Sequence, residues 1–297
     1  CVKLLTYWYT KNERATKWAL WNASQQIGAA ATVMLCGYLL VHHGWRSVFL
    51  IPGIIGILMS FFIFMRLRDT PSSMGLPTIE DFKGIEDSST KIDNELSLKE
   101  VIMQKLVKNP TIWLLCFANM FFYIFRIGIL NWAPTFLREL KGNSLQLAGF
   151  QTAVFDLSSI IGGIIAGYVS DKLLHGKRMP LCIFSMFTLA CLMFSLLYVS
   201  PRNVYLQTIL MILMGSFITS PQILIGVAAT DFSSKKVAGT ANGITGIFGY
   251  LGATISGVGV GILVEHYGWF SAFYTFIFSA IISALLFICI FKINTKH

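Results

Sequence analysis

A single arginine inside a long apolar stretch is the strongest chemical signal in the sequence. Arg126 lies in the segment YIFRIGILNW at residues 123–132, within an apolar run that begins near Ile112. About 14 helical residues, or roughly 21 Å at 1.5 Å per residue, separate the start of this run from Arg126, so its charge would lie deep in a bilayer. A central arginine costs about 2.5 to 3.5 kcal/mol on a translocon-based scale. The charge therefore requires an aqueous cavity, an anionic partner or an anionic ligand.

Two roles for Arg126 follow from the residues alone. A guanidinium binds two phosphate oxygens at once and stays charged at any relevant pH, so an anionic ligand would explain its position. Asp156, in the next apolar segment, could instead form a structural ion pair with Arg126 inside a helix bundle. The sequence leaves both roles open.

Polar side chains also gather in two other apolar segments. Asn22, Gln25 and Gln26 are spaced by i, i+3 and i+4, so they share one helix face and can point into a bundle interior or a cavity. Hydrogen bonds between helices would explain them as well as contact with a ligand. The segment from residue 240 carries eight glycines between positions 239 and 261, and Tyr250 is the only aromatic hydroxyl in that run. Tyr250 could reach a cavity or pack with its hydroxyl satisfied.

The elements that position these residues are predicted to be transmembrane helices. Hydrophobic residues make up 55% of the chain and charged residues only 12%, which excludes a soluble domain of 297 residues. Apolar segments of spanning length lie at residues 18–41, 48–65, 112–133, 147–169, 179–199, 204–228, 240–264 and 270–291. We expect an all-α membrane protein with eight whole spans. Residues 1–9 form half a span with no methionine before it, so the sequence looks cut inside a transmembrane helix.

The distribution of basic residues predicts the orientation. The connections after residues 9, 65, 169 and 230, together with the carboxyl tail, hold 17 lysines and arginines, and the opposite side holds four. The positive-inside rule therefore places the carboxyl terminus in the cytoplasm. The net charge of +9 therefore mostly reflects the basic residues that set the orientation of the helices in the membrane. Nucleic-acid binding would require a basic face with aromatic or helical readers, and the sequence has none.

Enzymatic and metal-binding functions find no support in the sequence. Five of the six cysteines lie in apolar segments without ligand spacing, and the histidines lie in loops or at the tail. No HExxH, GxSxG or P-loop pattern occurs. We expect no enzyme, no metal site and no cofactor.

An internal repeat predicts the architecture. HGWRSVF at 43–49 matches YGWFSAF at 267–273, and QIGAAAT at 26–32 partly matches YLGATIS at 250–256, in the same register and without a gap. One register over about 40 residues indicates a duplicated half. We therefore divide the chain into the remainder of a first helical half (1–65), a cytoplasmic linker with a surface helix at 98–108 (66–111), and a six-helix second half (112–297). Three helices and most of a fourth would be missing, as would the repeat counterpart of Arg126.

A charged corner follows the fourth predicted span. In GYVSDKLLHGKR at residues 167–178, Gly167 allows close helix contact, and Asp171 lies near Lys172 and Arg178. A carboxylate near cations could latch two helix ends in one conformational state, or it could cap a tight loop. The pattern resembles the cytoplasmic loop motif of the major facilitator superfamily.

The chain as a whole resembles the organophosphate:inorganic phosphate antiporters of that superfamily, which include glycerol-3-phosphate and hexose-phosphate transporters and a hexose-phosphate sensor. The resemblance covers nearly the whole chain. It rests on KNERATKWALWN, LRDTPSSMGLPTIEDFK, YIFRIGILNWAPTFL, GYVSDKLLHGKR and AGTANGITGIFGYLGA. It implies a major facilitator bundle with the end of helix 4, helices 5 and 6, and helices 7 to 12.

The resemblance also implies roles for individual residues. In that family two arginines, one from the first helix of each half, hold the phosphoryl group at the middle of the membrane, and Arg126 matches the second. Tyr123 and Tyr250 match pocket tyrosines. Asp156 matches an intramembrane acid that pairs with a cation near the first arginine.

Three positions depart from the family pattern. Gln25 stands where the transporters place a histidine, Asn131 where some members have aspartate, and Thr219 where an aromatic residue is common. The substrate-binding residues expected from the resemblance are Tyr123, Arg126, Tyr250, Gln25 and Asn131.

The function implied is that of a secondary transporter of the inner membrane. It would exchange a sugar phosphate, such as hexose 6-phosphate, for inorganic phosphate by alternating access. Because a glutamine cannot titrate, Gln25 leaves open a receptor on the same fold that senses sugar phosphate and signals to a membrane kinase. A third alternative is an inactive fragment. The expected partners are sugar phosphate, inorganic phosphate and the lipid bilayer.

Overall fold

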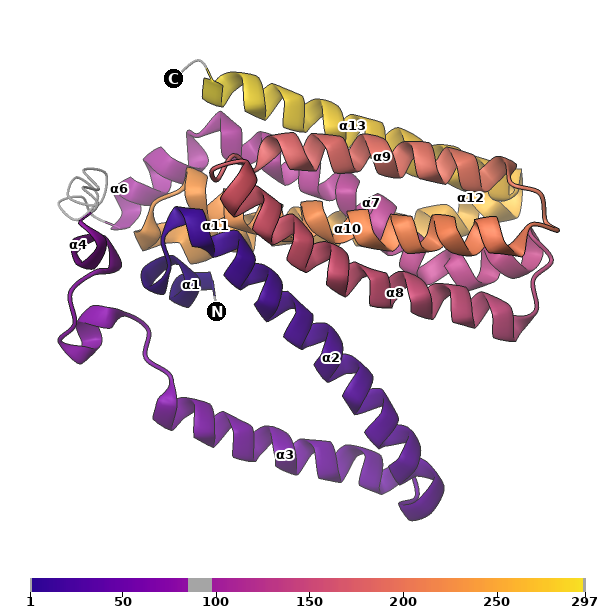
Figure 1. Cartoon of the computed structure of the whole chain (residues 1–297), viewed down its shortest axis with the longest axis horizontal. Helices are drawn as coiled ribbons and strands as arrows, with labels where there is room; N and C mark the ends of the chain where they lie inside the picture. Colours follow the sequence, from indigo (N-terminus) through magenta and orange to yellow (C-terminus); the bar gives the residue numbers. More distant parts are fainter. Residues whose placement is uncertain (1, 85–97, 296–297) are drawn as a thin grey trace.

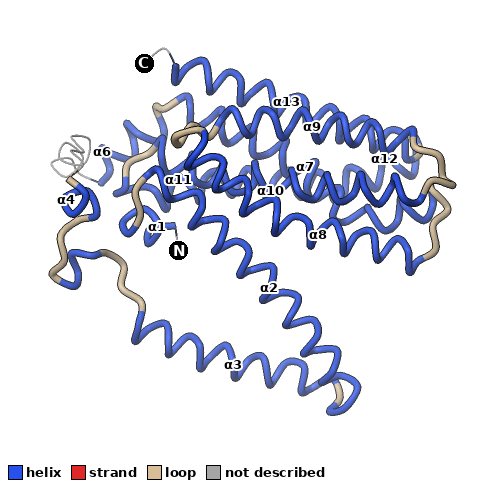
Figure 2. The backbone as a smooth tube through the Cα atoms, in the orientation of Figure 1, coloured by secondary structure: helices blue, strands red, loops and turns tan. Residues whose placement is uncertain are grey.

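The computed structural model describes residues 2–84 and 98–295, and this part of the chain is helical with short connections (Figure 1). Eight of its helices are long and apolar enough to cross a membrane, which confirms the predicted spans. Their bounds are α2 (Lys11–His43), α3 (Trp45–Arg66), α7 (Pro110–Glu139), α8 (Leu145–Tyr168) continued by η3 (Val169–Leu173), α9 (Met179–Tyr198), α10 (Val204–Phe232), the run η4–α11–η5–α12 (Lys235–Tyr267) and α13 (Trp269–Thr295). Figure 2 shows helices joined by loops, without strands, in the described residues.

Shorter elements complete the described chain. They are α1 (Val2–Trp8), η1 (Pro71–Met74), α4 (Ile79–Lys83), α6 (Leu98–Ile102) and the π-helical turn η2 (Met103–Val107). The predicted surface helix at 98–108 is thus present as α6 and η2. Pro110 then begins α7, where its missing N–H costs no hydrogen bond, and the side chain of Asn109 caps this helix by accepting a bond from the amide of Thr111 at 3.0 Å.

The spans from α7 to α13 pack into one bundle. The most extensive contacts join α8 with α10, α9 with α13, and α7 with both α11 and α13. Small residues let these backbones approach closely, because a Cβ added at Gly162 would overlap the backbone of Ser216 and one at Gly215 would overlap that of Phe155. Phenylalanines fill the interior, and the fully buried ones in the described chain are Phe122, Phe125, Phe136, Phe155, Phe273, Phe276 and Phe287.

The hairpin of α2 and α3 lies largely outside this bundle. In Figure 1, α2 crosses the bundle near its own start and diverges from it toward His43, and α3 returns farther out. The first turns of α2 are packed, with Ala15, Trp18 and Ala19 buried. No residue of α3 is buried.

The structure reproduces the internal repeat at the tip of each hairpin. Gly44 joins α2 to α3 with φ 77° and ψ 173°, and Gly268 joins α12 to α13 with φ 76° and ψ 176°. Ser47 donates to the carbonyl of Gly44 at 2.6 Å, as Ser271 does to Gly268 at 2.6 Å. The helical runs before these glycines are 33 residues long in both cases. We name α2–α3 the first hairpin and Lys235–Thr295 the second hairpin.

Candidate functional site

Three of the predicted substrate-binding residues lie together on α7 and α11. The guanidinium carbon of Arg126 lies 5.8 Å from the centroid of the Tyr123 ring, and the Tyr123 ring lies 6.1 Å from that of Tyr250. Tyr123 and Arg126 are partly buried, whereas Tyr250 is 71% exposed. The arrangement places a cation beside two phenol rings inside a membrane span.

Glycines make this arrangement possible. A Cβ at Gly252 would overlap the backbone of Met120, and one at Gly249 would lie 2.8 Å from the side-chain amide nitrogen of Asn119. The same Asn119 amide donates to the carbonyl of Thr245 at 2.7 Å and fixes the two helices in register. The glycine-rich segment therefore brings the Tyr250 ring against α7.

Arg126 has no bonded acid. Within residues 2–84 and 98–295, Arg126 and Asp156 do not form an ion pair, and Arg126 makes no hydrogen bond. The cation–π contact with Tyr123 offsets part of the cost of burying the charge. All donors of the guanidinium remain available for an anion.

Gln25 and Asn131 are not joined to this group by any polar contact in the described chain. Gln25 is exposed on α2, and Asn131 is exposed on α7 five residues after Arg126, about 140° farther around the helix at 100° per residue. Thr219 is buried on α10, where its methyl group would lie 2.8 Å from a Cβ at Gly163. Thr219 therefore serves the packing of α8 against α10.

Gln26 makes a hydrogen bond between helices, which is one of the two roles that the sequence left open for it. Its side-chain amide on α2 donates to the hydroxyl of Ser159 on α8 at 3.1 Å. The Ser159 hydroxyl donates in turn to the carbonyl of Asp156 at 2.6 Å. Asn22, one turn before Gln26, is buried.

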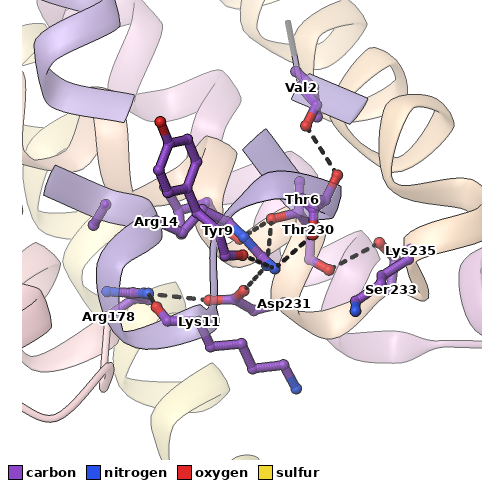
Figure 3. A network of polar contacts seen from close by, with 12 residues as sticks. Val2, Thr6, Tyr9, Lys11, Arg14, Arg178, Thr230, Asp231, Ser233 and Lys235 are labelled. Atoms are coloured by element: carbon purple, nitrogen blue, oxygen red, sulfur yellow. Dashed lines mark hydrogen bonds and ion pairs between the residues drawn. The ribbon is translucent and has the colours of Figure 1, made fainter. Parts of the chain in front are cut away.

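Four charged residues form a largely buried ionic cluster where α2, η3, the start of α9 and α10 meet. It consists of Arg14, Asp171, Arg178 and Asp231. Arg14 pairs with Asp231 at 2.6 Å, and Arg178 bridges Asp171 at 2.5 Å and Asp231 at 3.2 Å. Figure 3 shows Asp231 between the two arginines. Arg14 is only 2% exposed, so each charge depends on its partners for compensation.

The charged loop motif supplies one side of this cluster. Asp171 accepts hydrogen bonds from the backbone amide of Thr16 at 2.7 Å and from its hydroxyl at 2.8 Å, so α8 is bonded directly to α2. Gly167 permits this approach, because a Cβ there would lie 2.8 Å from the carbonyl of Ala15. Lys172 of the motif is exposed. No role for Arg14 or Asp231 was predicted from the sequence, although both are charged residues at the ends of apolar spans.

The short helix α4, between α3 and α7 in the chain, contacts the same end of the bundle. Lys83 of α4 pairs with Glu13 at the start of α2 at 2.8 Å. Glu80 of α4 pairs with Lys235 at the start of the second hairpin at 2.5 Å. The short helix α4 therefore bridges the corresponding ends of the two hairpins.

Comparisons with known proteins agree with this architecture. Residues 1–257 match the family model described as the Major Facilitator Superfamily. A probable hexose phosphate transport protein of Chlamydia trachomatis is 36% identical over 97% of this chain and 66% of the relative. The membrane sensor protein UhpC of Escherichia coli is 33% identical over 96% of this chain and 66% of the relative.

A hexose-6-phosphate:phosphate antiporter of Salmonella typhimurium is 33% identical over 88% of this chain and 57% of that protein. The chain spans about two-thirds of the length of the first two relatives. The match to the family covers most of the chain, and these relatives align over 88% to 97% of it. The chain therefore belongs to the organophosphate:phosphate antiporter family of the major facilitator superfamily.

Proposed function

We propose that the protein exchanges a sugar phosphate for inorganic phosphate across the inner membrane by alternating access. The observation that carries this proposal is Arg126, a guanidinium within a membrane span, which lies beside Tyr123 and Tyr250 and has no bonded acid among the described residues. Such a group binds a phosphoryl anion through paired charge-assisted hydrogen bonds. Relatives named as hexose phosphate transport proteins support a sugar phosphate as the organic substrate.

The ionic cluster supports alternating access. Its four side chains hold α2 against α8 and α10 at one end of the bundle, and the positive-inside rule predicts that this end faces the cytoplasm. When the two halves rock apart at this end, the buried pairs must separate and become hydrated. We infer that the structure corresponds to a conformation closed toward the cytoplasm.

A receptor on the same fold is the second candidate. A relative named as a membrane sensor protein and Gln25, which cannot titrate, favour it. This receptor would bind sugar phosphate and signal to a membrane kinase without moving substrate across the bilayer.

Counterflow of labelled phosphate in proteoliposomes separates the two candidates. We expect vesicles that are loaded with labelled phosphate and contain the full-length protein to exchange this phosphate for external hexose 6-phosphate without any kinase. Saturable binding of hexose 6-phosphate without flux would instead support the receptor. Absence of both binding and flux would contradict both candidates.

Substitution of Arg126 tests the site itself. Arg126→Lys keeps the charge but loses the planar fork, and loss of charge-assisted hydrogen bonds worth about 1.5 to 3 kcal/mol predicts a fall in exchange of about 10- to 150-fold. Arg138→Lys is the matched control, because Arg138 is exposed near the end of the same helix. We expect the control to exchange normally.

A double substitution addresses the alternative of a structural charge. If Arg126 mainly neutralised Asp156, removal of both charges would restore what Arg126→Ala destroys, since no uncompensated charge would remain. We expect Arg126→Ala combined with Asp156→Ala to reach the membrane and fail to exchange phosphate. Near-normal exchange by this variant or by Arg126→Lys would exclude Arg126 as the phosphate ligand.

A further inference from the structure

The side-chain amide of Gln26 has hydrogen-bonding capacity that residues 2–84 and 98–295 do not use. A glutamine amide carries two N–H donors and an acceptor oxygen. One N–H is bonded to the Ser159 hydroxyl at 3.1 Å. The amide oxygen and the second N–H have no partner in the part of the chain that the structure describes. Together they form a donor and acceptor pair on a partly buried side chain.

Gln26 and Arg126 lie at similar distances from the same end of the bundle. The depth of Gln26 is counted along α2 from Lys11, and that of Arg126 along α7 from Pro110. At 1.5 Å per residue both side chains lie about 23 Å into their helices. Asp156 lies at a similar depth when α8 is followed back from Leu173, at the same end of the bundle.

The internal repeat gives independent support for this position. The register that relates Gly44 to Gly268 and Ser47 to Ser271 also relates Gln26 to Tyr250. Tyr250 contacts Tyr123 beside Arg126 from the second hairpin. Gln26 therefore occupies the corresponding position on the first hairpin, and its contact with α8 turns it toward the second half.

Ser159 ties Gln26 to the neighbourhood of Arg126. Ser159 is buried, donates to the carbonyl of Asp156 and accepts from Gln26, so the direction of the Gln26 amide is fixed. Asp156 and Ser159 lie on α8, which packs against α7, the helix that carries Arg126. A phosphate on Arg126 would therefore lie on the helix next to α8, which carries Ser159 and its contact with Gln26.

We propose that Gln26 binds hydroxyl groups of the organic part of the substrate, with Ser159 as its positioning residue. A hydroxyl both donates and accepts, which matches the free oxygen and N–H of the amide. This inference rests on the proposed function and extends it, because it assigns the organic part to Gln26 on α2 and the phosphate to Arg126 on α7. Inorganic phosphate has no organic part and does not depend on Gln26.

Ligand affinity measured separately for two ligands tests the proposal. Calorimetric titration of the purified protein in nanodiscs would use glucose 6-phosphate and inorganic phosphate as probes. Loss of one hydrogen bond, worth about 0.5 to 1.5 kcal/mol, predicts that Gln26→Leu weakens glucose 6-phosphate about 2- to 12-fold. Its affinity for phosphate should change less than about twofold. Ser159→Ala should change the ratio of affinities in the same direction by a smaller factor.

Two further variants keep the test decisive. Gln26→Asn retains the amide one methylene shorter, so it should fold and give an intermediate ratio even if Gln26→Leu does not fold. Ser24→Ala is the matched control for Ser159→Ala, because the exposed Ser24 hydroxyl donates only within its own helix, to Trp21 at 2.6 Å. The control should leave the ratio unchanged.

The outcomes separate this inference from the proposed function. An equal loss of affinity for both ligands would mean that Gln26 only joins α2 to α8, and the proposal would fail. Unchanged affinities in Gln26→Leu and Gln26→Asn would also overturn it. An unsubstituted protein that binds neither ligand would refute the proposed function and the assignment of Gln26 with it.

Discussion

The two hairpins share one sequence register and one turn geometry but differ in burial. Gly44 and Gly268 have nearly the same backbone angles, and the following serines make the same hydrogen bond. Phe49 of the first hairpin is 72% exposed, whereas its counterpart Phe273 is 1% exposed. Similar local sequences therefore give similar hairpins whether or not a bundle surrounds them.

The helices of the hairpins also differ in regularity. The second hairpin contains the π-helical turn η5 (Ile255–Gly259), and the corresponding residues 31–35 of α2 are regularly α-helical. The turn η5 contains Gly257 and Gly259, and glycine restricts the backbone least because it has no side chain. The second hairpin packs against α7, and its π-helical turn η5 lies at this contact.

The largest expected difference in stability is between alanine substitutions of Phe273 and Phe49. Phe273→Ala should lower the free energy of unfolding by about 3 kcal/mol, because it leaves a cavity against Phe136 in a packed interior. Phe49→Ala removes an exposed ring and should change it by less than about 0.5 kcal/mol. Unfolding of both variants in mixed micelles measures the difference. Equal losses would show that the first hairpin is packed in the membrane.

Alanine substitutions of the two turn glycines, Gly44 and Gly268, should destabilise the protein to a similar extent. A Cβ at Gly44 or at Gly268 would meet no atom within 4 Å, so alanine at either position adds only backbone strain. At these angles, which are essentially restricted to glycine, the strain is about 1 to 3 kcal/mol. Thermal unfolding in detergent should give similar losses for Gly44→Ala and Gly268→Ala.

Gly37→Ala is the control for the turn glycines. Gly37 is helical and also has open space around its Cα, so alanine should be neutral or slightly stabilising. A loss confined to Gly268→Ala would mean that the turns are not equivalent.

The smallest effects are expected where α4 joins the two hairpins. The pair of Glu80 with Lys235 is less exposed than the pair of Lys83 with Glu13. Glu80→Gln should cost up to about 1 kcal/mol of stability and Lys83→Gln a few tenths, and both losses should shrink in about 1 M salt. Asp69→Asn, which breaks a well-exposed pair with Lys3, is the control and should have no measurable effect. A larger loss for Lys83→Gln than for Glu80→Gln would contradict the ranking.

Much of the fold follows from the sequence because a helix in lipid satisfies its own backbone hydrogen bonds. The lengths of the apolar runs therefore predicted the eight spans. The spacing of the repeat predicted that two distant hairpins share one geometry, since a turn that requires glycine is a local property. The position of Arg126 in its apolar run was sufficient to mark it as a functional candidate.

The partners of the charged and polar residues were decided only by the tertiary structure. Arg14 pairs with Asp231 across 217 residues of sequence, and Gln26 rather than Gln25 reaches Ser159. Each contact depends on how one helix is rotated and placed against another. The packing of many side chains fixes that rotation, and no local pattern contains it. For the same reason, the sequence alone did not determine that Arg126 has no ion pair with Asp156 in the described chain.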